Sequence, residues 1–157
     1  MTFVTVDEAK LHLRVEGTAE DTLIAVYIAA AELSAVSTIE RKVYADGTAL
    51  AAAIAAAPAV LAAALATYEA AVDAANLLTE PDLTCEALRV AEADYFKAKI
   101  TFRQTNDGMV VNDSIKSAVL LIIGSLYAQR EDVVVGLSVT KLPNGAEWLL
   151  QPYRVYS

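Results

Sequence analysis

The sequence predicts a mainly α fold: a helical bundle with a small β-hairpin and an alanine-rich antiparallel helical hairpin inserted in its middle. Apolar residues recur along most of the chain at three- and four-residue steps, the spacing of an amphipathic helix. Alanine, the strongest helix former, dominates residues 49–78, while a β-branched run near residue 133 favours a strand. With 157 residues, the chain has the length of one domain, 1–157, in which 49–108 is a helical-hairpin extension.

The first forty residues predict two helices. Thr5 and Glu8 have the spacing of a capping box, which predicts a short helix running to about Leu13. Residues 18–21 resemble a second helix start, with carboxylates near the positive end of the helix dipole, and this helix runs to about Glu40. One apolar stripe on it should face the core: Leu23, Ile24, Tyr27, Ile28, Ala31, Ala35 and Ile39.

A brief extended segment at residues 42–45 and a turn at Asp46-Gly47 precede the predicted hairpin. Pro58 must start a helix or kink one, residues 79–82 break the helical pattern, and residues 106–108 end it. The two helices carry seams of coiled-coil-like spacing: Ile54, Leu61, Leu65, Tyr68, Val72 and Ala75 in the first, and Leu88, Ala91, Tyr95, Ala98 and Phe102 in the second. The alternative is that this stretch is an ordinary part of the globular core.

The last third predicts a central core helix, a short β element and a closing helix. Residues 112–114 offer N-caps for a helix with a wide apolar face: Ile115, Ala118, Val119, Ile122, Ile123, Leu126 and Tyr127. Residues 133–135 predict a strand that pairs with residues 139–140 across a tight turn. A last short helix ends at Pro152, and residues 153–157 form a tail.

Composition excludes several classes of function. Twenty acidic residues against twelve basic ones give a net charge of -8, the wrong sign for gripping phosphate backbones, and residues 45–109 are the most acidic part, with nine acids and four bases. The longest strongly apolar run, residues 118–128, is shorter than the roughly 20 residues of a membrane span, and the N-terminus lacks the features of a signal peptide. We therefore expect no membrane partner.

The sequence also offers little chemistry. His12 is the only histidine, so a catalytic triad or a metal site would have to be built around this single position. Cys85 is the only cysteine, so an intrachain disulfide cannot form. No glycine-rich phosphate loop is present, and the paired acids at helix ends are explained by capping. We expect a protein that is not an enzyme and has no catalytic, metal or cofactor site.

The remaining candidate for a functional site is a surface that binds other proteins. Trp148, Tyr153, Arg154 and Tyr156 gather aromatic rings and a guanidinium at the chain end, where a tail frays unless something holds it. Such residues are typical interface anchors. The alternative is that Trp148 and the two leucines after it close the core.

Three segments resemble the head-tail connector, or adaptor, proteins of long-tailed bacteriophages and prophages. Residues 4–15, with 20–24 and 29–32, are similar to that family's N-terminal region; residues 115–122 and 126–131 resemble its core helix; and residues 148–154 resemble its closing motif. Each segment alone is a weak signal, but their order and positions are specific. The alanine-rich middle, about 49–108, is longer and more helical than in the family's compact members.

The resemblance implies a structural virion protein, assembled in the bacterial host cytoplasm. It implies a ring of about twelve copies under the portal, extending a DNA channel that does not bind DNA specifically. Its partners would be further copies of itself, the portal protein, and a stopper or tail-completion protein. The expected portal or subunit contacts are Tyr127, Arg130, Glu131, Trp148, Leu149, Leu150, Tyr153 and Arg154.

Two other readings stay open. A small helical DNA-packaging or regulatory protein that contacts DNA is the first alternative, and salt-dependent DNA affinity would favour it. A small hydrolase on a helical scaffold is the second. It would have to use isolated carboxylates, hydroxyls or His12.

Overall fold

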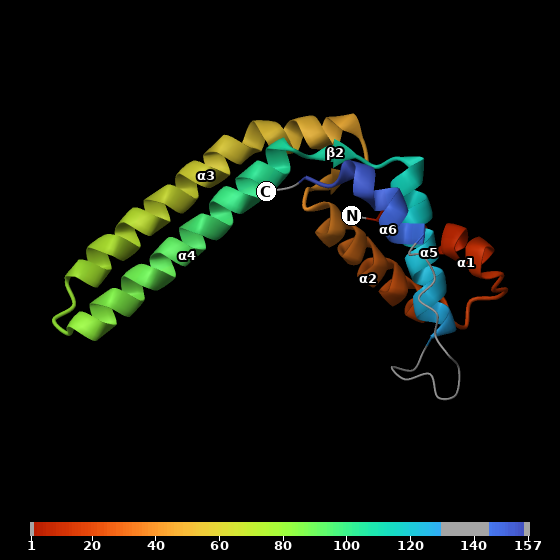
Figure 1. Cartoon of the computed structure of the whole chain (residues 1–157), viewed down its shortest axis with the longest axis horizontal. Coiled ribbons are helices and arrows are strands. Elements are labelled where there is room, and N and C mark those ends of the chain that lie inside the picture. Colours follow the sequence, from red (N-terminus) through yellow and green to blue (C-terminus); the bar gives the residue numbers. More distant parts are fainter. Residues whose placement is uncertain (1, 130–144, 156–157) are drawn as a thin grey trace. The chain divides into compact units, whose positions relative to one another are not determined.

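The computed structural model describes residues 2–129 and 145–155, and these are mainly helical, as the sequence predicts (Figure 1). The elements in chain order are α1 (Val6–Leu13), α2 (Asp21–Ile39), β1 (Val43–Tyr44), α3 (Gly47–Asn76), α4 (Pro81–Asn106), β2 (Met109–Val110), α5 (Asp113–Ala128), α6 (Gly145–Leu150) and the 3₁₀ helix η1 (Gln151–Tyr153). The strands predicted at residues 133–135 and 139–140 lie outside the described residues. The described chain divides into two compact units: residues 1–46 with 109–157, and residues 47–108.

The core of the first unit is built on α2. The face of α2 that the sequence analysis assigned to the core carries Ile24, Ile28 and Ile39, each at most 1% exposed. Facing residues of α5 are equally buried, including Ile115 and Ile123 at 0%. The remaining fully buried positions of the two helices are small or β-branched: Ala31, Ala35, Ala118 and Val119. Small side chains at a helix contact let the two backbones approach closely, so this pair of helices forms a dense layer on which the other elements pack.

The N-terminal segment is fixed by a buried carboxylate. Glu32 on α2 is only 7% exposed, and its Oε1 accepts hydrogen bonds from the backbone N–H groups of Phe3 and, at 3.2 Å, Val4. Both apolar residues are buried with it, at 8% and 1% exposed. A buried carboxylate is tolerated when its oxygens are bonded in this way. Glu32 therefore ties the start of the chain to the middle of α2.

The short helix α1 begins as the sequence predicts. The Thr5 hydroxyl accepts from the Glu8 backbone N–H at 3.2 Å, while Glu8 Oε2 accepts from the Thr5 backbone N–H at 2.8 Å. The Lys116 ammonium of α5 donates to the other Glu8 oxygen at 3.2 Å. The helix that follows starts at Asp21, within the predicted start at residues 18–21, and has no side-chain cap.

A parallel two-stranded sheet stands where the chain leaves the first unit and returns to it. Val43 pairs with Met109 and Tyr44 with Val110, and the Val111 N–H donates to the Tyr44 carbonyl at 2.8 Å. The extended segment at residues 42–45 is thus confirmed, whereas β2 was not predicted. Parallel strands cannot be joined by a tight turn and need a long crossover connection, which residues 47–108 supply.

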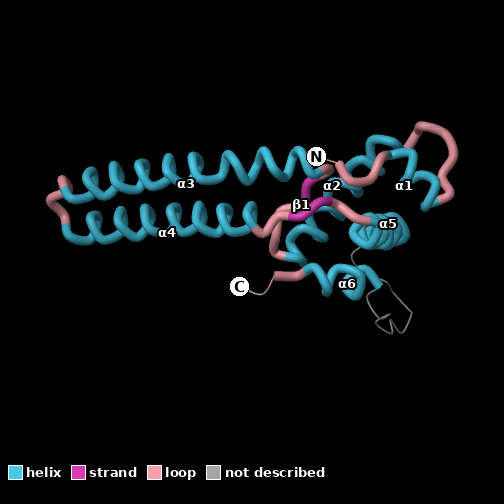
Figure 2. Tube along the Cα trace, turned by 90° about the horizontal axis from the view of Figure 1, so that it is seen from above, coloured by secondary structure: helices cyan, strands magenta, loops and turns pink. Residues whose placement is uncertain are grey.

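The second unit consists of α3 and α4, which are joined by residues 77–80 and lie side by side (Figures 1 and 2). In α4 the predicted seam is the least exposed line of residues, with Ala91 buried. In α3 the prediction is partly wrong. Ile54 and Leu65 are each 37% exposed, whereas Ala57 is 7% exposed. α3 continues through Pro58, so of the two alternatives for this proline the helix start is excluded.

Two described helices, α2 and α3, are long and apolar enough to cross a membrane by length and composition alone. This is a weak criterion, because a core helix of a globular unit also meets it, and α2 is such a helix. The hydropathy of α3 comes mostly from alanine, and α3 carries Glu69 and Asp73. The expectation of no membrane partner therefore stays a prediction.

Replacing the buried carboxylate tests how strongly the N-terminal segment is held. Glu32→Ala leaves two buried backbone N–H groups without an acceptor, so we expect the free energy of unfolding to fall by about 2–4 kcal/mol in urea denaturation. Glu69→Ala, at an exposed helical position, is the matched control and should change it by less than about 0.5 kcal/mol. Equal losses in both variants would contradict the anchoring role.

The Glu8 carboxylate gives a second test. The Thr5 backbone N–H, followed by the Lys116 ammonium, lowers the pKa of Glu8 below its ordinary value. A lowered folded-state pKa means that the stabilisation is present above the ordinary pKa and is lost as the pH falls through the lowered one. Lys116→Met should raise the Glu8 pKa toward its ordinary value in an NMR titration of the side-chain carboxyl. An unchanged titration would show that the ion pair is absent in solution.

Candidate functional site

The closing helix α6 and the 3₁₀ helix η1 that follows it pack on the core through four residues at helical spacing. Ala146, Leu149, Leu150 and Tyr153 follow each other at intervals of three, one and three positions, which places them on one face. Leu150 is 1% exposed, and the other three pack against the core cluster. Leu149 and Leu150 therefore close the core, which was one of the two alternatives that the sequence left open.

Trp148 does not take part in this packing. It falls between the positions of the buried face and is 77% exposed, the largest exposed aromatic side chain in the described chain. A helix fixed by Leu149 and Leu150 holds this indole in a defined place on the surface. Large aromatic side chains on a rigid support are typical anchors of protein–protein interfaces.

The segment after α6 is held by the C-terminal end of α2. The Val155 N–H donates to the Ile39 carbonyl at 3.1 Å, and the Arg41 guanidinium donates to the Tyr153 carbonyl at 3.5 Å. The Arg154 guanidinium donates to Glu40 Oε1 at 2.6 Å. Residues 153–155 of the tail are therefore held within the chain, by the end of α2.

The ion pair depends on an unusual backbone conformation. Glu40 caps the C-terminal end of α2 in the left-handed region, at φ 57°, where glycine is the usual residue. A side chain at this position costs roughly 1 kcal/mol in backbone strain. Because glycine has no side chain, only a residue such as glutamate can both end the helix here and bind Arg154.

A groove of about 640 Å³ lies between α2, α5 and α6 (Figure 1 shows these helices). Its apolar lining comes from Leu121, Ile122 and Leu126 of α5 with Leu150, and its polar lining from Ser34, Thr38, Ser125 and Glu147. Leu121 is 44% exposed. A groove with apolar walls and a few hydroxyl groups suits an apolar side chain of another protein.

The other expected contact residues have different surroundings. The half-buried Tyr127 donates its hydroxyl to Glu20 Oε2 at 2.5 Å, so it links the end of α5 to the start of α2. Arg130 and Glu131 lie outside the described residues. The structure thus groups Trp148, Leu149, Leu150, Tyr153 and Arg154 in one segment and places Tyr127 elsewhere in the same unit.

The described residues contain no group of three or more histidine, cysteine or acidic side chains that could hold a metal ion. His12 is exposed and lies beside Gly124 of α5, where an added Cβ would be 3.3 Å from its Nε2. Cys85 is exposed. Around α6, an exposed indole lies on the same helix that borders an apolar groove. Such an arrangement is suited to binding another protein.

Sequence reasoning missed the groove and the Glu40–Arg154 pair. The groove depends on how three helices meet, which no local pattern encodes. The exposure of Trp148, by contrast, could have been read from the sequence, because positions 146, 149, 150 and 153 form a complete helical stripe without it.

A family model described as phage gp6-like head-tail connector protein matches residues 3–154. The match includes segments of both units, among them the alanine-rich residues 47–108. No curated protein and no solved structure matches the chain.

Proposed function

The chain belongs to the phage gp6-like head-tail connector family, and on this premise we propose that it forms a ring under the portal that extends the DNA channel. As a member of this family it is a structural component of the virion that connects head and tail, and the family is not one of enzymes. In the proposed ring, about twelve copies contact each other through a closed heterologous interface. The ring binds the portal on one side and a stopper or tail-completion protein on the other.

The proposed portal contact rests mainly on the exposed Trp148. At 77% exposure this indole presents a large apolar surface to solvent from a helix whose other face is buried. Burying an aromatic ring of this size in a partner's pocket contributes several kcal/mol to binding. The groove beside α6 offers a second docking point, into which an apolar side chain of the portal can insert.

The charge of the chain supports a channel through which DNA slides. A net charge of -8 repels phosphate, whereas a basic wall would hold it by releasing counterions. The same charge argues against the alternative of a packaging or regulatory protein that binds DNA directly. A subunit with a net negative charge therefore fits passage of DNA without specific binding.

Trp148→Ala tests the docking surface directly. Because the side chain is exposed, the free energy of unfolding should change by less than about 0.5 kcal/mol, while affinity for purified portal should fall at least about tenfold in a titration. Leu11→Ala, which removes an apolar side chain that is 83% exposed on α1, is the matched control and should bind normally. Normal portal binding by Trp148→Ala would remove this residue from the interface.

Truncation after Leu150 tests the tail. Losing residues 151–157 removes the bonds to Ile39, Glu40 and Arg41, so we expect the free energy of unfolding to fall by roughly 1–3 kcal/mol without loss of the fold. Portal attachment should weaken as well. If Arg154→Ala alone attaches to the portal normally and the truncated chain does not, Arg154 only binds the tail to α2. The portal contact then lies elsewhere in the tail. Normal attachment by the truncated chain would exclude the tail from the contact.

A further inference from the structure

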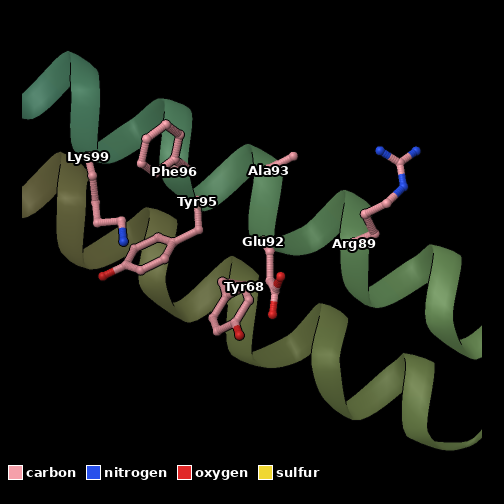
Figure 3. Close-up of a pocket in the computed structure, with 7 residues that line it drawn as sticks. All are labelled: Tyr68, Arg89, Glu92, Ala93, Tyr95, Phe96 and Lys99. Atoms are coloured by element: carbon pink, nitrogen blue, oxygen red, sulfur yellow. The ribbon is translucent and has the colours of Figure 1, made fainter.

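The second unit carries an aromatic surface that the connector role does not account for. Tyr68 of α3 stacks on Tyr95 of α4, with ring centroids 5.2 Å apart and planes at 22°. Beside them Phe96 is 56% exposed, and the Lys99 ammonium lies 5.0 Å from the Tyr95 centroid and 5.7 Å from that of Phe96. Figure 3 shows these side chains around a depression of about 600 Å³, with Glu92 next to Tyr68. We call these five residues the aromatic patch.

Two charges of the aromatic patch lack an ion-pair partner within the described residues. Four other charged residues of α4 are paired along the helix, Arg89 with Glu86 at 2.5 Å and Lys97 with Asp94 at 2.8 Å. Glu92 and Lys99 lie seven positions apart on α4, about two helical turns, and therefore project from the same side of the helix. Phe96 stands between them. Phe96 is thus an exposed ring between one acid and one base that form no ion pair in the described part of the chain. Such a surface can bind a second copy of itself, because the acid of one copy can meet the base of the other.

The charges of α4 are divided between its two halves. Residues 81–95 contain four acids and one base, and residues 96–106 contain three bases and no acid. Two copies of α4 packed in the same direction would place like charges together. Packed in opposite directions, they place the acidic half of each copy against the basic half of the other, which favours association.

We propose that the aromatic patch is the centre of a two-fold contact between two copies of this chain. A two-fold axis that is perpendicular to α4 and passes beside it, level with the point between residues 95 and 96, exchanges position 92 with position 99 of the other copy. Glu92 then pairs with Lys99 of the second copy, and Lys99 with its Glu92. The same axis places Phe96 over the second copy's Tyr95, at the depression that Tyr68 and Tyr95 form. Every contact is made twice, as in an isologous dimer.

The size of the surface is sufficient for such a contact. α4 has 26 residues and is therefore about 39 Å long, and two helices each about 10 Å across present roughly 800 Å². Stable protein interfaces bury about this area on each partner. The contact goes beyond the connector role and does not require it, because it pairs two chains and does not close a ring.

Sedimentation velocity of the full chain at low salt tests the proposal. We expect a concentration-dependent dimer, and we expect Phe96→Ala to raise its dissociation constant at least about tenfold. Val90→Ala is the matched control, because this apolar residue is 47% exposed and lies six positions from Phe96, on another side of α4. Circular dichroism checks that each variant keeps its helices.

Charge reversal distinguishes the proposed two-fold contact from other ways in which two chains could pair. Glu92→Lys and Lys99→Glu, each made alone, place like charges opposite each other twice and should weaken the dimer about tenfold. The double variant E92K/K99E restores both pairs and should recover the original affinity to within about threefold. Lys97→Glu makes the same charge change on another side of the helix, and it should weaken the dimer clearly less than Lys99→Glu does. A double variant as weak as the single ones would overturn the proposed axis.

Cross-linking identifies the molecule that contacts the aromatic patch. A photoreactive phenylalanine analogue at position 96 should form a cross-link to residues near Tyr95 of a second copy. Cross-links only to portal, tail protein or lipid would overturn the proposal, as would a chain that stays monomeric. If the chain forms rings but shows no dimer that Phe96→Ala weakens, the two-fold contact is wrong and the connector function stands.

Discussion

The close contact of α2 with α5 is the constraint on which the first unit depends. Alanines at positions 31, 35 and 118, all 0% exposed, let the two helices approach until the isoleucines on either side interlock. α1, α6 and η1 then pack on this layer, and Glu32 ties the first residues of the chain to it. A larger side chain at any of these alanines would separate the helices and weaken all the elements that rest on them.

Because β1 and β2 pair in parallel, the first unit can fold with an inserted segment of any sufficient length between these two strands. The chain leaves after Tyr44 and returns at Met109, and the hydrogen bonds between the strands fix both points within the first unit. Any crossover long enough to join parallel strands satisfies this geometry. The proposed portal contact lies on the first unit and the proposed dimer contact on the second, so the two surfaces are independent features of one chain.

Local patterns were predicted well because their physics is local. The capping box at Thr5 and Glu8, the stripe of α2 and the seam of α4 follow from helix periodicity and end effects. The seam of α3 was partly wrong, since in an alanine-rich helix many faces look alike: Ala57 is buried, whereas the predicted Ile54 is 37% exposed. Trp148 was predicted to be an interface anchor, and the structure shows that it is exposed while Leu149 and Leu150 pack in the core.

By itself the sequence determined the helical class, most element positions, the scarcity of catalytic side chains, and a resemblance that the family match confirms. These depend on composition and on spacing within one element. Only the tertiary structure decided that residues 153–155 bind α2, that β1 pairs with β2, and that the aromatic patch gathers on α3 and α4. Each of these joins residues far apart in the chain, and such contacts are set by how whole elements pack and not by the pattern within any one of them.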